Sequence, residues 1–189
     1  MRNSIIIKAL IAMLVIQSMA FYYYYSNTSK IIDSFETDLK SETARNLYQF
    51  GTALINTAET LAMYEDNMEN REKELFNRAN GNAQISLFLN ASRFARLPSG
   101  PNSAWDSNSK TDLFNKTFPL AETLSLVSDG KITDYNQVDE LAYILHLHGK
   151  KYHELIAKNE YKIYYDSKLV EEILNLNESL ENDLNNLLH

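Results

Sequence analysis

The stretch LYQFGTALINTAETLAMYEDNMENREKEL, residues 47–75, decides the fold. Apolar residues recur in it at intervals of seven: Leu47, Leu54, Leu61, Met68 and Leu75. Leu47, Leu54 and Leu61 are each followed three residues later by a member of a second set: Phe50, Thr57 and Tyr64. Steps of three and four place both sets on one stripe of an α-helix. We expect this stripe to be the core face of a long helix that continues into the charged stretch 65–74. A self-associating coiled coil is the second interpretation, although the stripe lacks matched charges on its flanks.

The composition supports a helical fold around this stretch. The chain of 189 residues has only 5 Gly and 3 Pro, too few to punctuate a turn-rich sandwich or barrel. It has no Cys, which excludes disulfides and thiolate chemistry. A formal net charge of −7 argues against a nucleic-acid binder. The predicted fold class is therefore all-α.

The N-terminal residues predict a membrane anchor. Residues 5–25 are apolar or aromatic apart from Lys8, Gln17 and Ser18, and as a helix they extend roughly 31 Å, which matches a bilayer core. The tyrosines at 22–25 would form an interfacial belt. Since Arg2 and Lys8 flank the start, we expect residues 1–4 in the cytoplasm and residues 26–189 outside the cell membrane, in a single-pass topology.

A secretory signal peptide is the competing interpretation of the same residues. Residues 1–8 would be its basic region, residues 9–16 its apolar region, and Ser18-Met19-Ala20 its cleavage site. Cleavage would then follow Ala20. Both interpretations export the rest of the chain.

Residues 26–189 are enough for one domain with one core. Beyond the first helix, apolar residues at helical spacing predict helices over 70–96, 111–128, 134–158 and 167–188. Pro98 ends the first of these, and Asp134 with Gln137 forms a candidate capping box. The face of the last helix that carries Asn175, Asn182, Asn185 and Asn186 should be solvated. Short connections between such helices predict an antiparallel bundle.

Residues 98–110 form the one long turn-type segment of the sequence, and they contain the only tryptophan, Trp105. This residue either folds back onto the bundle or serves as an exposed anchor for a partner. Tyr161, Tyr164 and Tyr165 belong to an excess of 12 tyrosines, a residue type that suits interfaces. These four residues are the predicted partner-binding positions.

No catalytic, cofactor-binding or metal-binding residue is predicted. His146, His148 and His153 with Glu154 are the one cluster of candidate metal ligands, but on a helix His148 lies opposite His146. The sequence has neither a Gly-rich phosphate loop nor a nucleophile elbow. We therefore expect no enzymatic activity.

Several short strings carry a resemblance to a known family. Thr60-Leu61-Ala62-Met63, Leu97-Pro98 and Phe114-Asn115-Lys116-Thr117 follow the apolar N-terminus in this order. Over residues 1–157 the chain resembles the helical N-terminal region of the YpeB-type spore germination proteins. That resemblance implies a non-catalytic, membrane-anchored protein that stabilises a partner enzyme.

Together these features predict a membrane-tethered extracytoplasmic helical module that binds or scaffolds another envelope protein without catalysing a reaction. Its predicted partners are the lipid bilayer and an envelope protein, with no nucleic acid, and a homo-oligomer is left open. The alternative is a helical bundle that senses a small ligand or signal but has no output domain of its own.

Overall fold

The computed structural model describes the backbone of residues 2–100 and 102–188 and the side chains from residue 13 onward, again without residue 101. Every regular element in this part of the chain is helical, which confirms the predicted all-α class. The α-helices are α1 (Arg2–Leu61), α2 (Asn70–Ser92), α3 (Ser107–Asn115), α4 (Phe118–Ser128), α5 (Tyr135–Asn159) and α6 (Ser167–Leu188). Two 3₁₀ turns, η1 (Phe94–Arg96) and η2 (Lys162–Tyr164), complete the set.

The chain divides into an N-terminal unit that ends at Asp38 and a second unit that begins at Leu39. The backbone of the N-terminal unit is helical from Arg2, and its large side chains from residue 13 onward are exposed, with Tyr22, Tyr23, Tyr24 and Tyr25 between 66% and 74% accessible. The second unit, which we call the bundle, contains the core.

The predicted transmembrane helix over residues 5–25 is wrong, and so is the single-pass cell-membrane localisation derived from it. Within the described part of the chain, no helix combines the length and the apolar character that a bilayer crossing requires. The physical reason lies in the second half of the stretch, where Gln17, Ser18 and four tyrosines replace aliphatic residues. Tyrosine prefers the membrane interface to the hydrocarbon. The predicted tail, residues 1–4, has side chains outside the described residues.

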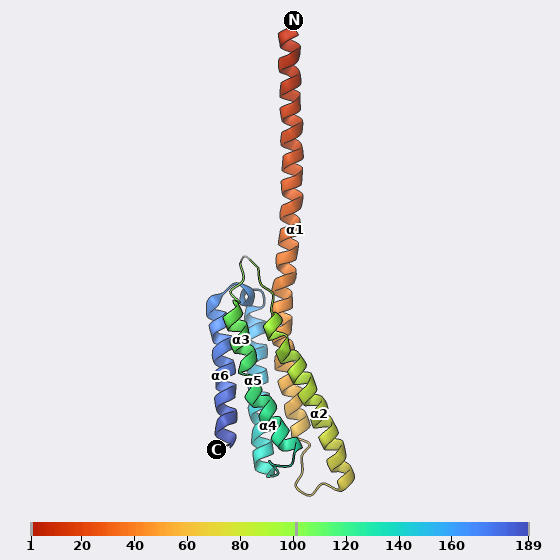
Figure 1. Cartoon of the computed structure of the whole chain (residues 1–189), viewed down its shortest axis with the longest axis vertical. Coiled ribbons are helices and arrows are strands. Elements are labelled where there is room, and N and C mark those ends of the chain that lie inside the picture. The colour runs from red at the N-terminus through yellow and green to blue at the C-terminus, as the bar shows by residue number, and fades with distance from the viewer. Residues whose placement is uncertain (1, 101, 189) are drawn as a thin grey trace. The chain divides into compact units, whose positions relative to one another are not determined.

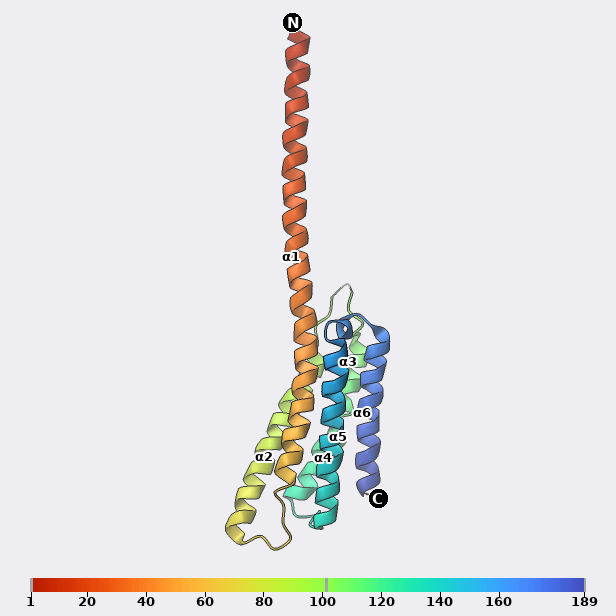
Figure 2. The ribbon, with the colours of Figure 1, turned by 180° about the vertical axis from the view of Figure 1, so that it is seen from behind.

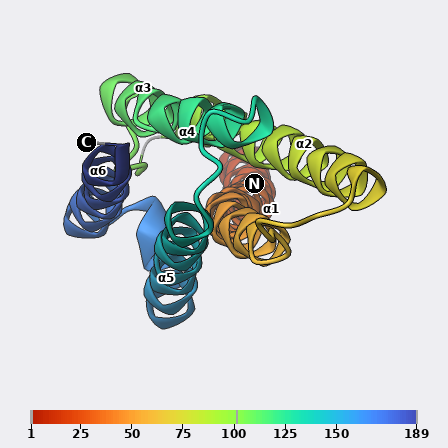
Figure 3. The ribbon, with the colours of Figure 1, turned by 90° about the horizontal axis from the view of Figure 1, so that it is seen from below.

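Consecutive helices of the bundle run in opposite directions, except that α3 and α4 run in the same direction (Figure 1). From Leu39, α1 runs toward the turn at residues 62–69, α2 returns, α3 and α4 descend in succession, α5 returns and α6 descends to the C-terminus (Figure 2). Seen along the helices, α5 and α6 lie side by side, and α2 lies at the rim (Figure 3). The largest fully buried side chains include Trp105, Tyr152, Tyr164, Phe50, Phe94, Leu47, Leu54 and Leu61.

The stripe predicted in α1 is a core face, as expected. Leu47, Phe50 and Leu54 are fully buried, and Leu61 is 1% exposed. The helix nevertheless ends at Leu61 rather than within residues 65–74, because residues 62–69 form turns. The heptad therefore stops being one face, and Leu75, on the next helix, is 56% exposed.

The helix predicted over residues 111–128 is two helices, α3 and α4, with a break at residues 116–117. Pro119 stands in the first turn of α4, where its missing N–H leaves no hydrogen bond unmade. The helices predicted over 134–158 and 167–188 correspond closely to α5 and α6. Asp134 caps α5 by accepting a hydrogen bond from the Asn136 N–H at 2.8 Å.

Helices α1 and α5 cross at two glycines, Gly51 and Gly149. A Cβ placed on Gly149 would lie 2.7 Å from the Gly51 carbonyl oxygen and 2.6 Å from Cγ1 of Ile55. Beside this crossing, the rings of Tyr48 and His153 stack with their centroids 3.9 Å apart. The backbones can approach this closely only because neither glycine has a side chain.

Candidate functional site

Trp105 is part of the core, so it folds back onto the bundle and does not present its ring to a partner. Its side chain is 2% exposed, and its indole N–H donates to the Ile163 carbonyl at 2.9 Å. The Ala104 N–H donates to the Tyr164 carbonyl at 2.8 Å, which ties the same loop to η2. The loop is also shorter than the predicted 98–110, because α3 begins at Ser107.

The three predicted tyrosines divide between core and surface. Tyr164 is 1% exposed and belongs to the buried set, whereas Tyr161 and Tyr165 are 48% and 49% exposed. The Lys40 ammonium lies over the Tyr165 ring, 5.4 Å from its centroid, in a cation–π geometry. Of the predicted partner-binding residues, only Tyr161 and Tyr165 therefore offer exposed rings, and their role stays a prediction.

The candidate metal ligands on α5 point to different neighbours. His148 is fully buried, and its Nε2 lies 2.7 Å from Oδ2 of Asp183 on α6. The Nε2 of His153 instead faces Oγ1 of Thr52 at 3.0 Å. Among the described residues, no group of three or more acidic or histidine side chains is placed to hold a metal ion.

The buried imidazole of His148 has an unusual environment. Its Nδ1 has no hydrogen-bond partner in the described part of the chain, while Nε2 is placed to donate to Asp183. Burial lowers the pKa of His148, an effect that the hydrogen bond to Asp183 opposes. The neutral ring therefore fits this site, because a second N–H would be buried without an acceptor.

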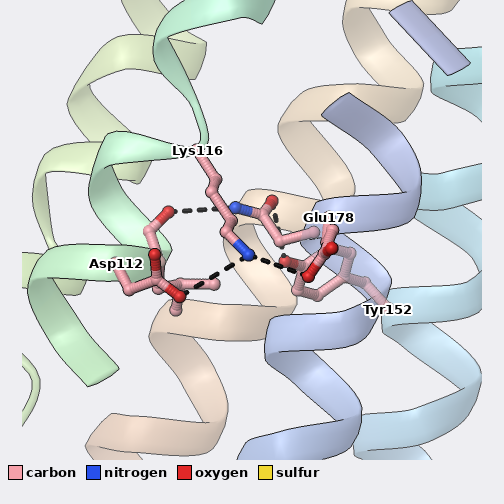
Figure 4. A network of polar contacts seen from close by, with 6 residues as sticks. Asp112, Lys116, Tyr152 and Glu178 are labelled. Atoms are coloured by element: carbon pink, nitrogen blue, oxygen red, sulfur yellow. Dashed lines mark hydrogen bonds and ion pairs between the residues drawn. The ribbon is translucent and has the colours of Figure 1, made fainter. Parts of the chain in front are cut away.

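A polar network joins α3, α5 and α6 (Figure 4). The Tyr152 hydroxyl donates to Oδ1 of Asn177 at 3.3 Å, and Nδ2 of Asn177 donates to the Leu113 carbonyl at 3.0 Å. The Lys116 ammonium lies 3.0 Å from Glu178 and 3.6 Å from Asp112. Since Leu113 is in the last turn of α3, this network satisfies a carbonyl that the helix leaves free, which is a structural task.

Lys110 is a buried cation beside the loop. Its Nζ hydrogen-bonds to the Ser99 hydroxyl, and burial lowers the pKa of the amine while Asp106 opposes that shift. We interpret the pair as an anchor between the loop and α3.

Helix α2 differs from the other bundle helices in having two apolar faces. Phe76, Leu87 and Ala91 are buried against the bundle. Outside this buried face α2 exposes four large apolar residues, which we call the α2 outer face: Leu75 at 56%, Ile85 at 61%, Phe88 at 49% and Leu89 at 56%. The Phe88 ring contacts that of Phe114, with the centroids 6.5 Å apart, and the Phe114 ring contacts that of Phe118, with the centroids 5.2 Å apart. Phe118 is itself 50% exposed. This surface was missed in the sequence, although apolar residues at 75, 76, 85, 87, 88 and 89 are too many for one face.

A groove of about 360 Å³ lies at the N-terminal end of α2. We call it the α2 groove; it is lined by Met63, Glu65, Met68, Glu72, Leu75, Phe76 and Ala79. The residues of α2 in this set are spaced by three and four and so share one face of the helix. The opposite wall comes from the turn at residues 62–69, which the Tyr64 hydroxyl fixes by donating to the Thr133 carbonyl at 2.9 Å.

Comparison with known protein families, characterised proteins and solved structures finds no match to this chain. The resemblance to the YpeB-type proteins therefore stays a prediction. Function has to be argued from the surfaces described above.

Proposed function

We propose that the chain is a non-catalytic helical module that binds another protein, and that the partner docks on α2. The observation that carries this proposal is the α2 outer face, a row of exposed Leu, Ile and Phe side chains on a helix whose other side is already packed. Ile85, Phe88 and Leu89 are neighbours on the helix surface because they are three and four residues apart, and clustered exposed apolar residues of this kind mark interaction sites in folded proteins. The occupant that fits it is a helix of the partner protein.

The spacing on α2 supports a helical occupant. Ile85 and Leu89 are one turn apart, and Phe88 stands three residues after Ile85, so the three form a ridge on the helix surface. A ridge of this type packs into the groove between side-chain rows of a second helix. Aromatic residues such as Phe88 and Phe118 are typical of interface centres.

Paired variants of the full chain test the proposal. Ile85→Ser with Phe88→Ser removes the centre of the face, whereas Tyr143→Ser removes an equally exposed aromatic ring from α5. The protein captured from cell extract by the wild-type chain is purified, and its affinity is measured by calorimetry. We expect the double variant to bind at least about tenfold more weakly and Tyr143→Ser to bind normally.

Two results would overturn the docking site. One is unchanged affinity of the double variant; the other is an equal loss in Tyr143→Ser. Sedimentation velocity of the purified chain tests a further outcome. If the wild-type chain sediments as a dimer and the double variant as a monomer, the occupant of the face is a second copy of the chain and not a different protein.

A small apolar ligand is the second candidate function, and the α2 groove favours it. Its volume of about 360 Å³ falls at the lower end of the range of small-molecule sites. Stabilisation of the chain by a neutral apolar compound, lost in Leu75→Ser and kept in Ile85→Ser with Phe88→Ser, would support ligand sensing over protein binding.

A further inference from the structure

The α2 groove combines apolar walls with carboxylates. Glu65 and Glu72 line it together with the apolar side chains. Residues 65–74 contain five acidic side chains and two basic ones: Glu65, Asp66, Glu69, Glu72 and Glu74 against Arg71 and Lys73. Burial raises the pKa of Tyr64 on the edge of this region, and the nearby charges of Asp66 and Asp134 raise it further. The groove is therefore an apolar site in a negative field.

The apolar walls are adaptable on one side and fixed on the other. Met63, which is 66% exposed, and Met68 come from the turn, and unbranched thioether side chains adjust to different apolar partners. Phe76 is 5% exposed, and its ring contacts that of Tyr64 in a tilted arrangement, with the ring centroids 5.3 Å apart. A bound segment would therefore contact the packed ring of Phe76 on one side and the adaptable side chains of Met63 and Met68 on the other.

The position of Glu72 is fixed by the helix start. Its Oε2 accepts a hydrogen bond from the Glu69 N–H at 2.9 Å, so the side chain folds back over the first turn of α2. A carboxylate still has acceptor capacity after one such bond. Glu72, Leu75, Phe76 and Ala79 then form a face roughly 10 Å long, which is two turns of helix.

We propose that the α2 groove binds a basic amphipathic helix of the partner protein, with apolar side chains against Met68, Leu75 and Phe76 and with Lys or Arg side chains at Glu65 and Glu72. This inference goes beyond the proposed function, because it adds a second contact surface on α2, which shares only Leu75 with the α2 outer face, and names the charge of the segment that binds there. A helix laid in an apolar groove is a known mode of recognition, and the carboxylates supply the preference for a basic sequence.

Two labelled peptides of about 14 residues test the inference by fluorescence anisotropy with the full chain. Both carry Leu at helical spacing; one has Lys at the remaining positions and the other has Glu. We expect the Leu–Lys peptide to bind at least about tenfold more tightly than the Leu–Glu peptide, which corresponds to 1.4 kcal/mol. Added salt should weaken the Leu–Lys complex.

Charge-matched variants separate the groove from general attraction to an acidic protein. Glu65→Gln with Glu72→Gln should weaken the Leu–Lys complex roughly three- to tenfold. Glu171→Gln with Glu172→Gln changes the net charge equally on the exposed side of α6 and should leave binding unchanged. An equal loss in both double variants would overturn the inference.

The remaining outcomes distinguish the two proposals. If both peptides bind equally and Leu75→Ser abolishes both complexes, the groove accepts a helix without regard to charge; the inference then fails and the proposed function stands. If neither peptide binds and Ile85→Ser with Phe88→Ser leaves partner capture unchanged, both fail. Thermal melting of each variant identifies a loss of binding that comes from unfolding.

Discussion

Replacing Gly149 with alanine should destabilise the bundle, although alanine is the better helix former. At this position α1 and α5 are in backbone contact: the added Cβ would lie 2.7 Å from the Gly51 carbonyl oxygen and 3.2 Å from the Ile55 amide nitrogen. Both atoms belong to the backbone of α1, so neither can rotate away. The helices must move apart, and the neighbouring core contacts must loosen with them.

The magnitude follows from a comparison with Gly81, a glycine inside α2. A Cβ on Gly81 would meet no atom within 4 Å, so Gly81→Ala gains only the helix preference of alanine, about 0.8–1 kcal/mol. Gly149→Ala gains the same amount and loses about 1–3 kcal/mol to overpacking. Because the helix preference cancels in the comparison, the two variants should differ in free energy of unfolding by about 1–3 kcal/mol.

Urea denaturation followed by circular dichroism at 222 nm, the ordinary helix signal, measures both variants against the wild-type chain. Gly81→Ala should unfold at a higher urea concentration than the wild-type chain. Gly149→Ala should unfold at a lower urea concentration than Gly81→Ala. If the two variants gain equal stability, the α1–α5 crossing is wider than the structure shows, and the argument for glycine at both positions fails.

Three further predictions concern the core. Trp105→Ala should lower the stability by about 3–5 kcal/mol, because a buried indole and its bond to Ile163 are lost; an unchanged melting temperature would contradict the placement of the loop. Asn177→Ala should lower it by about 2–4 kcal/mol in denaturant titrations, since the Leu113 carbonyl and the Tyr152 hydroxyl lose a buried partner. Because the pKa of His148 is lowered in the folded state, the unfolded chain takes up a proton at a higher pH than the folded chain does. The contribution of the neutral His148 ring to the free energy of unfolding should therefore be fully present above about pH 6.5 and be lost as the pH drops through the folded-state pKa. His148→Gln should flatten this pH dependence in melting curves recorded across pH.

Much of the bundle could be predicted from periodicity, because buried positions leave a clear helical pattern. The stripe of Leu47 and Leu54 and the spans of α5 and α6 follow directly from it. The end of α1 at Leu61 could not be predicted, since Met68 and Leu75 continue the seven-residue interval beyond the turn. Beyond the turn the interval no longer marks one helix face, because Met68 is partly buried against the core whereas Leu75, on the next helix, is 56% exposed.

The surface residues were harder to predict than the core. Trp105 was weighed as an interface anchor because it is a lone aromatic residue in a turn-rich segment, yet its indole N–H finds an acceptor 58 residues later, at Ile163, in a contact that no local pattern encodes. The N-terminal stretch failed for a chemical reason: counting tyrosine as apolar overstates its preference for hydrocarbon. For Trp105 the sequence left two positions open, and the structure bears out the one in which it folds back onto the bundle.

The position of α2 at the rim gives its excess of apolar residues a meaning that the sequence alone does not. A helix with apolar residues on all sides is expected at the centre of a fold, where each side is covered. In the bundle, α2 instead lies at the rim (Figure 3). Phe76 and Leu87 are buried, while Ile85 and Leu89 remain more than half exposed. Core packing explains the first pair and does not explain the second. If Ile85 and Leu89 serve binding alone, the double variant Ile85→Ser with Leu89→Ser should leave the urea midpoint of the isolated chain nearly unchanged. The same variant should still bind the captured partner more weakly. A large loss of stability would instead place these side chains in the core and remove the main support for a binding function.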